Sequence, residues 1–426
     1  MKKPLFVLLA SLFIVMIGFG ITLPVLTFYV ERLALAAGAA PRTIVLHVTL
    51  LTSVYALMQL LFAPLWGRLS DRIGRRPLIL MGIAGYVAAQ IMFGLSTSLW
   101  LLYAARIVGG ILSSATLPAS AAYVVDMTTK DERARGMAWL GTATSLGVIV
   151  GPALGGVLSR RDWHFTASVG HLRIDGFSTP FFAAALLGLL VLPAAWRWLP
   201  ESLPSATAVP TGRVEAAQRL KSWPALVRVL APLLVMTITG QLALAMFEAT
   251  FALFAQSKFA FGPTEVGYVF VVCGLVMTLM QTGAVGCLTG RITALAQIVA
   301  GFTIMGVGIT LLATAQSIVP VFAFVALLSA GMALIAPNLS ALVSTRGGAR
   351  QAGTALGIQN SASSLGQSIG PLLGGGLYIW QRNAPYLVGG ALLAAVALAT
   401  GRKALAGGRD GSTAEEHITL TDGGTP

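Results

Sequence analysis

The sequence predicts an all-α membrane protein with twelve transmembrane helices, arranged as two pseudo-symmetric six-helix bundles. Three observations lead to this fold class. Hydrophobic residues make up 56% of the 426 residues and charged residues only 10%, with a mean hydropathy of +0.82, a balance typical of membrane proteins. Long apolar runs recur along the chain. The second half of the chain also repeats motifs of the first half.

Each predicted span is an apolar run long enough to cross about 30 Å of hydrocarbon, which takes roughly 20 helical residues. The first run follows Lys2 and Lys3 and is too long for the apolar part of a signal peptide, so we expect it to remain as a membrane helix. In chain order the twelve predicted spans are 4–30, 44–66, 77–96, 99–124, 137–159, 179–199, 230–255, 263–285, 293–314, 318–342, 352–378 and 384–406.

The distribution of basic residues predicts the orientation of the spans. If the N-terminus is cytoplasmic, most of the 28 Lys and Arg residues fall in cytoplasmic loops, as the positive-inside rule requires. We therefore expect both termini in the cytoplasm and the chain in a bacterial-type inner (plasma) membrane. The net charge of +13 reflects this asymmetry, so we expect the lipid bilayer, and no nucleic acid, as a partner.

The polar residues argue against an enzyme. The four histidines and two cysteines match no metal-ligand or nucleophile–base spacing. There is no phosphate-binding loop motif, which argues against direct use of ATP. We therefore expect no enzymatic activity, no cofactor and no metal.

An internal repeat divides the chain. The segment GVIVGPALGG (147–156) returns as GQSIGPLLGG (366–375), and GRLSDRI (67–73) returns at the same offset as GCLTGRI (286–292). We expect one six-helix half in 1–199 and a second in 230–406, joined by a cytoplasmic linker, 200–229, rich in Pro, Ala, Ser and charge. The polar tail 407–426 is expected to be disordered.

The first half carries an insertion, 160–177, on the predicted outer side. Its rough alternation around Gly170 is compatible with a short β-hairpin over the outer mouth. A tolerated surface insertion is the alternative interpretation.

Four motifs resemble those of the drug:proton antiporters of the major facilitator superfamily, and among them the tetracycline exporters. They are GRLSDRIGRRP (67–77), ARIVGG (105–110), DMTTKDERARG (126–136) and GVIVGPALGG (147–156). The resemblance implies the major facilitator fold, in which two parallel six-helix repeats rock around a substrate site near the midplane. It also implies that the first, fourth, seventh and tenth spans line the cavity, and that the chain exports its substrate.

The first motif predicts an inner gate. The positive-inside rule explains its arginines, but it does not explain Asp71. We expect Asp71 to face the positive amino end of the helix that starts near Ala352, and the resemblance implies that Arg75 meets Asp126. The gate candidates are Gly67, Asp71, Arg72, Gly74, Arg75 and Asp126.

The antiporter motif of the fifth span predicts a close helix contact. Gly147, Gly151 and Gly155 recur every four residues and leave one smooth helix face, while Pro152 bends the helix. The resemblance implies that this face packs against the eighth span and seals the outer side. Ordinary small-residue packing is the alternative interpretation.

Two charged residues inside the spans are the candidates for proton coupling. Arg106 lies in the fourth span and Glu248 in the seventh, and intramembrane charges mark functional sites by default. Apolar surroundings favour the neutral form of a carboxyl group and a nearby arginine favours the charged form, so proton binding can respond to a change in environment. A static salt bridge and a binding site for a cationic substrate are the alternatives.

One departure from the resemblance concerns the substrate. Tetracycline exporters carry an Asp in the first span where this chain has Val15, which puts tetracycline itself in doubt. Other polar and aromatic residues of the spans are candidates for substrate contact, with interhelical hydrogen bonding and packing as the alternative. They are Gln241, Phe247, Phe251, Asn338, Gln359 and Asn360.

A large cavity with few polar groups suits lipophilic compounds better than sugars. The leading hypothesis is a proton-coupled antiporter that exports lipophilic drugs or metabolites and functions as a monomer. A lipid or lysolipid flippase on the same fold, a proton symporter for a small nutrient and a non-transporting receptor are the alternatives.

Overall fold

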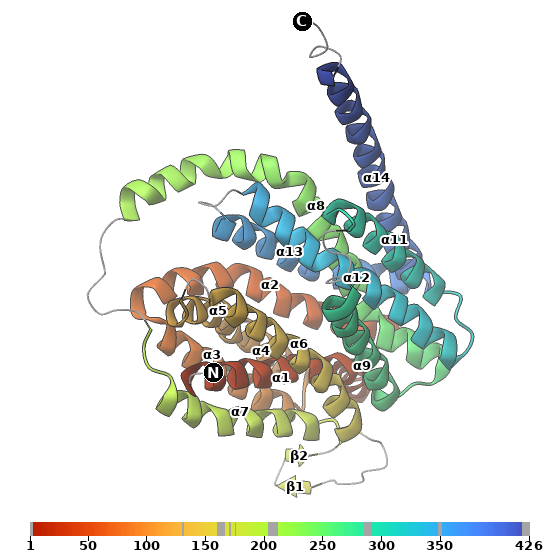
Figure 1. Cartoon of the computed structure of the whole chain (residues 1–426). Coiled ribbons are helices and arrows are strands. Elements are labelled where there is room, and N and C mark those ends of the chain that lie inside the picture. Colours follow the sequence, from red (N-terminus) through yellow and green to blue (C-terminus); the bar gives the residue numbers. More distant parts are fainter. Residues whose placement is uncertain are drawn as a thin grey trace, which may run out of the picture.

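The computed structural model describes residues 3–129, 132–159, 167–169, 172–174, 176–202, 212–284, 291–347 and 352–419. Almost all of them are helical (Figure 1). The first bundle contains α1 (Lys3–Ala36), α2 (Pro41–Ile73), α3 (Arg75–Gly94), α4 (Leu99–Ser113), α5 (Thr116–Met127), α6 (Arg133–Leu158) and α7 (Thr179–Trp198). The second bundle contains α8 (Gly212–Phe259), α9 (Pro263–Leu279) with the π-helical turn η1 (Met280–Ala284), α11 (Ala294–Leu312), α12 (Ile318–Arg346), α13 (Ala352–Trp380) and α14 (Ala384–Thr419).

Ten helices within the described ranges are long and apolar enough to cross a membrane. The fourth predicted span is one of them, although a turn at Ser114 divides it into α4 and α5. Of the two remaining predicted spans, α9 is a shorter apolar helix. The other, α13, carries the stretch GIQNSASSLGQSIG (357–370), whose glycines, serines and amides lower its hydropathy.

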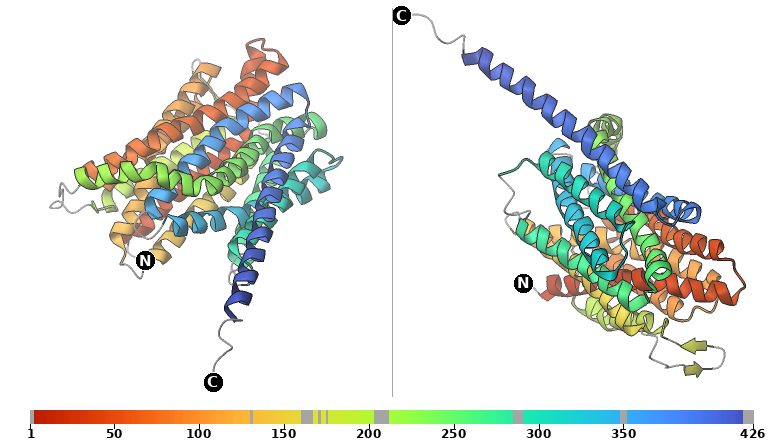
Figure 2. Two further views of the ribbon diagram at one scale, coloured as in Figure 1. Left: turned by 90° about the horizontal axis from the view of Figure 1, so that it is seen from above. Right: turned by 90° about the vertical axis from the view of Figure 1, so that its right-hand side faces the viewer.

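Each bundle has its own hydrophobic core. The core of the first bundle includes the fully buried Tyr29, Tyr123 and Phe181, and that of the second includes Phe254 and Phe302. Figure 2 shows the two bundles side by side, the first from red to yellow-green and the second from green to blue. Across the interface, α2 packs against α13 and α6 packs against α9.

The repeated glycine motif makes equivalent contacts in the two bundles. A Cβ built at Gly151 of α6 would collide with the backbone of Gly20 in α1, and one built at Gly370 of α13 would collide with the backbone of Leu242 in α8. Backbones approach this closely only where side chains are absent. The sequence repeat is therefore also a repeat of helix packing.

We expected the helix face formed by the three glycines of α6 to pack against the eighth span, and this prediction is wrong. Gly147, Gly151 and Gly155 face α1, whereas the eighth span, α9, is contacted by the next residue, Gly156. Thr264 Oγ1 of α9 donates a hydrogen bond to Gly156 O over 2.8 Å. Adjacent residues point about 100° apart on a helix, so Gly155 contacts α1 while Gly156 contacts α9.

The insertion forms a short hairpin in its described part. Strand β1 (Ala167–Val169) pairs antiparallel with β2 (Leu172–Ile174), with Ser168 opposite Arg173. This agrees with the hairpin interpretation around Gly170, although residues 160–166, 170–171 and 175 lie outside the described residues. The hairpin lies beyond α6 and α7 (Figure 1), and we call this end of the molecule the hairpin end.

Two segments are more helical than the sequence predicts. Helix α8 begins at Gly212, so residues 212–229 of the expected linker continue directly into the seventh span. Helix α14 continues through 407–419, where a disordered tail was expected, and residues 420–426 lie outside the described residues. Both segments contain alanine and glutamate, which favour helix.

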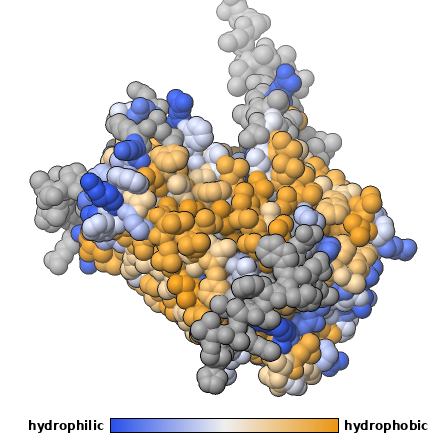
Figure 3. All heavy atoms as spheres, turned by 90° about the horizontal axis from the view of Figure 1, so that it is seen from below, coloured by the Kyte–Doolittle hydropathy of each residue, from blue (hydrophilic) through white to orange (hydrophobic). Residues whose placement is uncertain are grey.

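The outer surface of the bundles is apolar. Figure 3 shows a broad hydrophobic belt with hydrophilic residues gathered toward its margins. Exposed tryptophans lie near both ends of the helices, Trp100 and Trp380 near the hairpin end and Trp196 and Trp198 at the opposite end. This is the pattern of a membrane-spanning protein with aromatic residues at both interfaces.

Candidate functional site

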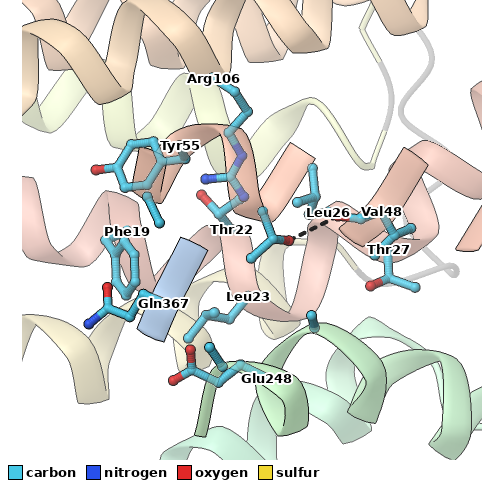
Figure 4. A pocket seen from close by; sticks show the side chains of 14 residues that line it. Phe19, Thr22, Leu23, Leu26, Thr27, Val48, Tyr55, Arg106, Glu248 and Gln367 are labelled. Carbon is cyan, nitrogen blue, oxygen red and sulfur yellow. Dashed lines mark hydrogen bonds between the residues drawn. The ribbon is translucent and has the colours of Figure 1, made fainter. Parts of the chain in front are cut away.

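A cavity lies between the two bundles. Its wall is formed by α1, α2 and α4 of the first bundle and by α8 and α13 of the second (Figure 4). The charged residues in this wall are Arg106 and Glu248, and most of the others are apolar or hydroxylated. Its volume is about 50 Å³, which is room for a few water molecules.

Arg106 is held by aromatic rings rather than by an acid. Its side chain is only 7% exposed, and its guanidinium carbon lies 5.2 Å from the ring centre of Tyr55 and 5.4 Å from that of Phe93. Cation–π contacts of this kind offset part of the cost of burying the charge. Within the described part of the chain Arg106 forms no ion pair, and its buried Nε has no hydrogen-bond partner.

Glu248 lies on the opposite side of the cavity. Figure 4 shows its carboxylate at the cavity wall, with Leu23 and Thr22 between it and Arg106. No hydrogen bond or ion pair joins this carboxylate to another described residue. The sequence predicted that both charges face one cavity, and the structure places both in its wall. The alternative of a static salt bridge is not formed in this conformation.

Gln367 is a cavity residue that the sequence analysis missed. Its Nε2 donates a hydrogen bond of 3.1 Å to Oε1 of Gln241, which joins α13 to α8 beside the cavity. Gln241 was a candidate for substrate contact, and it instead orients Gln367. The signal was present in the sequence, because Gln367 directly follows Gly366, the first glycine of the repeated motif.

The other candidates for substrate contact lie away from this cavity. Phe247 and Phe251 are buried in the core of the second bundle, where both rings pack against Phe270. They lie on one side of Glu248 around the helix, so they point into the core while Glu248 points to the cavity. Asn338 donates to Gln297 Oε1 (3.0 Å) and joins α12 to α11. Gln359 is buried and Asn360 is exposed.

The first motif forms a charged cluster at the end opposite the hairpin. Arg75 Nε lies 3.1 Å from Asp126 Oδ2, which is the contact that the resemblance implied. Glu201, which the sequence analysis missed, accepts hydrogen bonds from the backbone N–H groups of Arg75 (2.8 Å) and Arg76 (3.2 Å). Its carboxylate thus caps the first turn of α3, where unpaired N–H groups favour negative charge.

The remaining gate candidates differ in what the structure describes. Gly74 has φ +105°, and a Cβ built there would collide with the Glu201 carboxylate. Arg72 is exposed, and a Cβ at Gly67 would meet no described atom within 4 Å. The side chain of Asp71 lies outside the described residues, so its expected contact with the amino end of α13 stays a prediction.

Residues of both bundles meet at the hairpin end. Gln256 Nε2 of α8 donates a hydrogen bond of 2.6 Å to Glu31 Oε2 of α1. Leu253 of α8 is buried in the core of the first bundle, and Gly375 of α13 lies against Thr49 of α2. The bundles are therefore in direct contact at this end.

Comparison with known proteins identifies the family. The family model for the Major Facilitator Superfamily matches residues 8–371 and 233–417. The chain is 31% identical over 377 residues to the class D tetracycline resistance protein of Salmonella ordonez, covering 88% of this chain and 89% of the relative. It is 27% identical over 407 residues to multidrug resistance protein 2 of Bacillus subtilis, covering 91% and 92%.

Solved structures show the same fold. A bacterial homolog of the human lysosomal transporter Spinster, in an inward-facing and unoccupied conformation, matches with a TM-score of 0.71 at 15% identity, over 93% of this chain and 95% of the other. The human organic anion transporter MFSD10 matches with a TM-score of 0.69 at 24% identity, over 93% and 99%. The chain therefore belongs to the major facilitator superfamily, a family of membrane transporters rather than of enzymes.

Proposed function

We propose that the protein is a proton-coupled antiporter that exports lipophilic drugs or metabolites by alternating access. The observation that carries this proposal is the position of Glu248. Its carboxylate lies in the wall of the cavity between the bundles and has no partner among the described residues. A proton or a positively charged substrate group can occupy it, but not both, and such competition is the simplest basis for antiport.

The placement of the two charges supports alternating access. Arg106 belongs to α4 of the first bundle and Glu248 to α8 of the second, so rocking of the bundles changes their separation and their access to water. A cavity of about 50 Å³ is smaller than the roughly 300–1,000 Å³ of small-molecule sites. The bundles must therefore move apart to admit a drug-sized molecule.

The charged cluster around Arg75 is proposed as part of the inner gate. Its ion pair with Asp126 and the cap by Glu201 fix the loop between α2 and α3, which holds Asp71 at the end of α2. We propose that Asp71 meets the amino end of α13 when the inner side closes. The contacts at the hairpin end, including Gln256 with Glu31, then form the outer gate.

The proposed substrates follow from the cavity wall and the relatives. Phe19, Leu23, Leu26 and Ala249 provide apolar surface, which suits lipophilic molecules. The relatives are named for resistance to tetracycline, to multiple drugs and to quinolones. Val15 still argues against tetracycline as a substrate of this chain. We propose a functional monomer in a bacterial-type plasma membrane, with both termini in the cytoplasm.

Purified protein in liposomes tests the proposal. An imposed pH gradient should drive uptake of lipophilic dyes into inside-out vesicles, and Glu248→Gln should abolish this dependence because the amide cannot bind the proton. Glu265→Gln is the matched control, since Glu265 caps α9 at the hairpin end, where it accepts from Gly262 N. Uptake that ignores the gradient in the wild-type protein would rule out antiport.

A further inference from the structure

Resting on the proposed function, we infer that the cavity recognises amphoteric substrates, in which a basic amine and an acidic group are joined by an apolar scaffold. The amine pairs with Glu248 and the acidic group, a carboxylate, pairs with Arg106. The inference narrows the substrate class from lipophilic compounds in general to those that carry both charges.

The argument begins with the guanidinium group of Arg106. Its side chain is more than nine-tenths buried, its Nε is unpaired, and no described carboxylate pairs with it. Tyr55 and Phe93 contact the guanidinium, but aromatic rings do not satisfy its five N–H donors. A buried arginine without an acceptor is costly, and an anionic substrate group in the cavity removes that cost.

No described acid on the neighbouring helices fulfils this role. Val15 of α1, an apolar residue, lines a second small cavity that Arg106 also borders. The remaining polar groups there are amides and hydroxyls, such as Gln90, whose Oε1 is buried without a partner. Among the described residues around Arg106, the positive charge is therefore not neutralised by the protein.

Glu248 provides the opposite charge on the opposite wall. Figure 4 shows the two side chains facing the cavity from different bundles, with Thr22 and Leu23 between them. Because they do not pair with each other, each is free to pair with a ligand. The surface between them is mostly apolar, which matches a hydrophobic scaffold with a charge at each end.

This arrangement is compatible with antiport. The amine of the substrate displaces the proton from Glu248, while its acidic group satisfies Arg106. A ligand with only an amine leaves Arg106 without an acceptor after the cavity closes. A ligand with only an acidic group is repelled by ionised Glu248 and does not compete with its proton.

Equilibrium binding to the full-length purified protein tests the inference without any gradient. The probes are the zwitterionic fluoroquinolone ciprofloxacin, its methyl ester, which lacks the acidic group, and its N-acetyl derivative, which lacks the basic amine. Quinolone fluorescence reports binding. We expect the zwitterion to bind at least about tenfold more tightly than either derivative, because hydrogen bonds to charged groups contribute about 1.5–3 kcal/mol each.

Variants assign the preference to the two residues. Arg106→Gln should bring the affinity ratio of zwitterion to ester to about one, because the acidic group of the zwitterion then has no cationic partner, whereas Arg106→Lys should keep part of the preference. Glu248→Gln should remove the preference of zwitterion over the N-acetyl derivative. Arg402→Gln is the control and should change no ratio, since Arg402 lies in a groove between α11 and α14, away from the cavity.

Equal affinities for the three probes in the wild-type protein would overturn the inference. So would an Arg106→Gln protein that is folded by size-exclusion chromatography and weakens all three probes alike. If Arg106→Gln does not fold, the inference is tested by the affinities of the three probes for the wild-type protein and for Arg106→Lys. Binding is measured without a gradient, so the affinity order of the three probes does not depend on proton coupling. Failure of proton-driven uptake in liposomes would contradict the antiport proposal but would not change that order.

Discussion

Arg75 Nε lies 3.1 Å from Asp126 Oδ2, and this ion pair joins the start of α3 to the end of α5. The two side chains are 11% and 26% exposed, so water screens the pair only in part. Asp126 Oδ2 also accepts a hydrogen bond of 3.0 Å from Ser202 Oγ, which follows α7. One carboxylate therefore connects the ends of three membrane spans.

Asp126→Asn should reduce transport while the protein still folds. The substitution removes the charge but keeps the size, and we expect a loss of about 1 kcal/mol of stability, the upper range for a partly exposed ion pair. Uptake in liposomes and thermal unfolding in detergent measure the two effects. Glu132→Gln is the control, because Glu132 is exposed and, among the described residues, its carboxylate accepts a hydrogen bond from Thr129 in the same loop. Wild-type uptake by Asp126→Asn would contradict a gating role for the pair.

Gly74→Ala should be more damaging than Gly38→Ala. Both glycines have positive φ, +105° and +73°, where an L-residue is strained by about 1–2 kcal/mol. At Gly74 the new Cβ would also displace the Glu201 carboxylate that caps α3, whereas at Gly38 it would meet no described atom within 4 Å. We expect both substitutions to lower the unfolding temperature through backbone strain, with the larger decrease, and loss of transport, for Gly74→Ala. Equal effects of the two substitutions would show that the cap by Glu201 has no role.

Two glycines of α6 provide a second matched pair. A Cβ at Gly151 would collide with the backbone of Ile17 and Gly20 in α1, but a Cβ at Gly141 would meet no described atom within 4 Å. Gly141→Ala should therefore be neutral or stabilise the helix by up to about 1 kcal/mol. Gly151→Ala should force α6 and α1 apart and lower both the unfolding temperature and transport. If Gly151→Ala has the unfolding temperature of the wild-type protein, the close contact between α6 and α1 does not contribute to stability.

Much of the fold could be predicted because a membrane restricts the choice of structure. Backbone groups in hydrocarbon must be paired, so apolar runs of sufficient length become helices, and the offset of the glycine motifs indicated the two bundles. The neighbour of a given helix face could not be predicted. A helix that is apolar all round, such as α6, has no polar side that fixes its rotation. The face around Gly151 was therefore assigned to the wrong partner.

The sequence predicted the two charged residues of the cavity, but it did not predict the residues that surround them. Arg106 and Glu248 stand out because charges are rare inside spans, whereas Tyr55 is an ordinary membrane aromatic until its ring is seen beneath the guanidinium. Phe247, the neighbour of Glu248 in the sequence, was a candidate for substrate contact. Rotation by one residue places it in the core instead.

Val15→Asp should provide Arg106 with the acid that it lacks. Val15 of α1 and Arg106 of α4 line the same cavity of about 30 Å³, so a carboxylate at position 15 enters the space that Arg106 borders, and we expect the two to pair. A paired Arg106 no longer needs an acidic group on the ligand. We expect ciprofloxacin and its N-acetyl derivative to lose about tenfold in affinity, on the scale of one charged hydrogen bond, while the methyl ester keeps its affinity.

Val15→Asn is the control for this substitution, because it has nearly the size and polarity of Asp without the charge. It should preserve the order of the three affinities. If Val15→Asp leaves the zwitterion as the tightest ligand by the same factor, the acidic group of the ligand does not reach Arg106. If Val15→Asp instead weakens the ester as strongly as the zwitterion, the cavity has been distorted and not neutralised. Only selective loss of the acid-bearing ligands fits an arginine whose missing partner is supplied by the substrate.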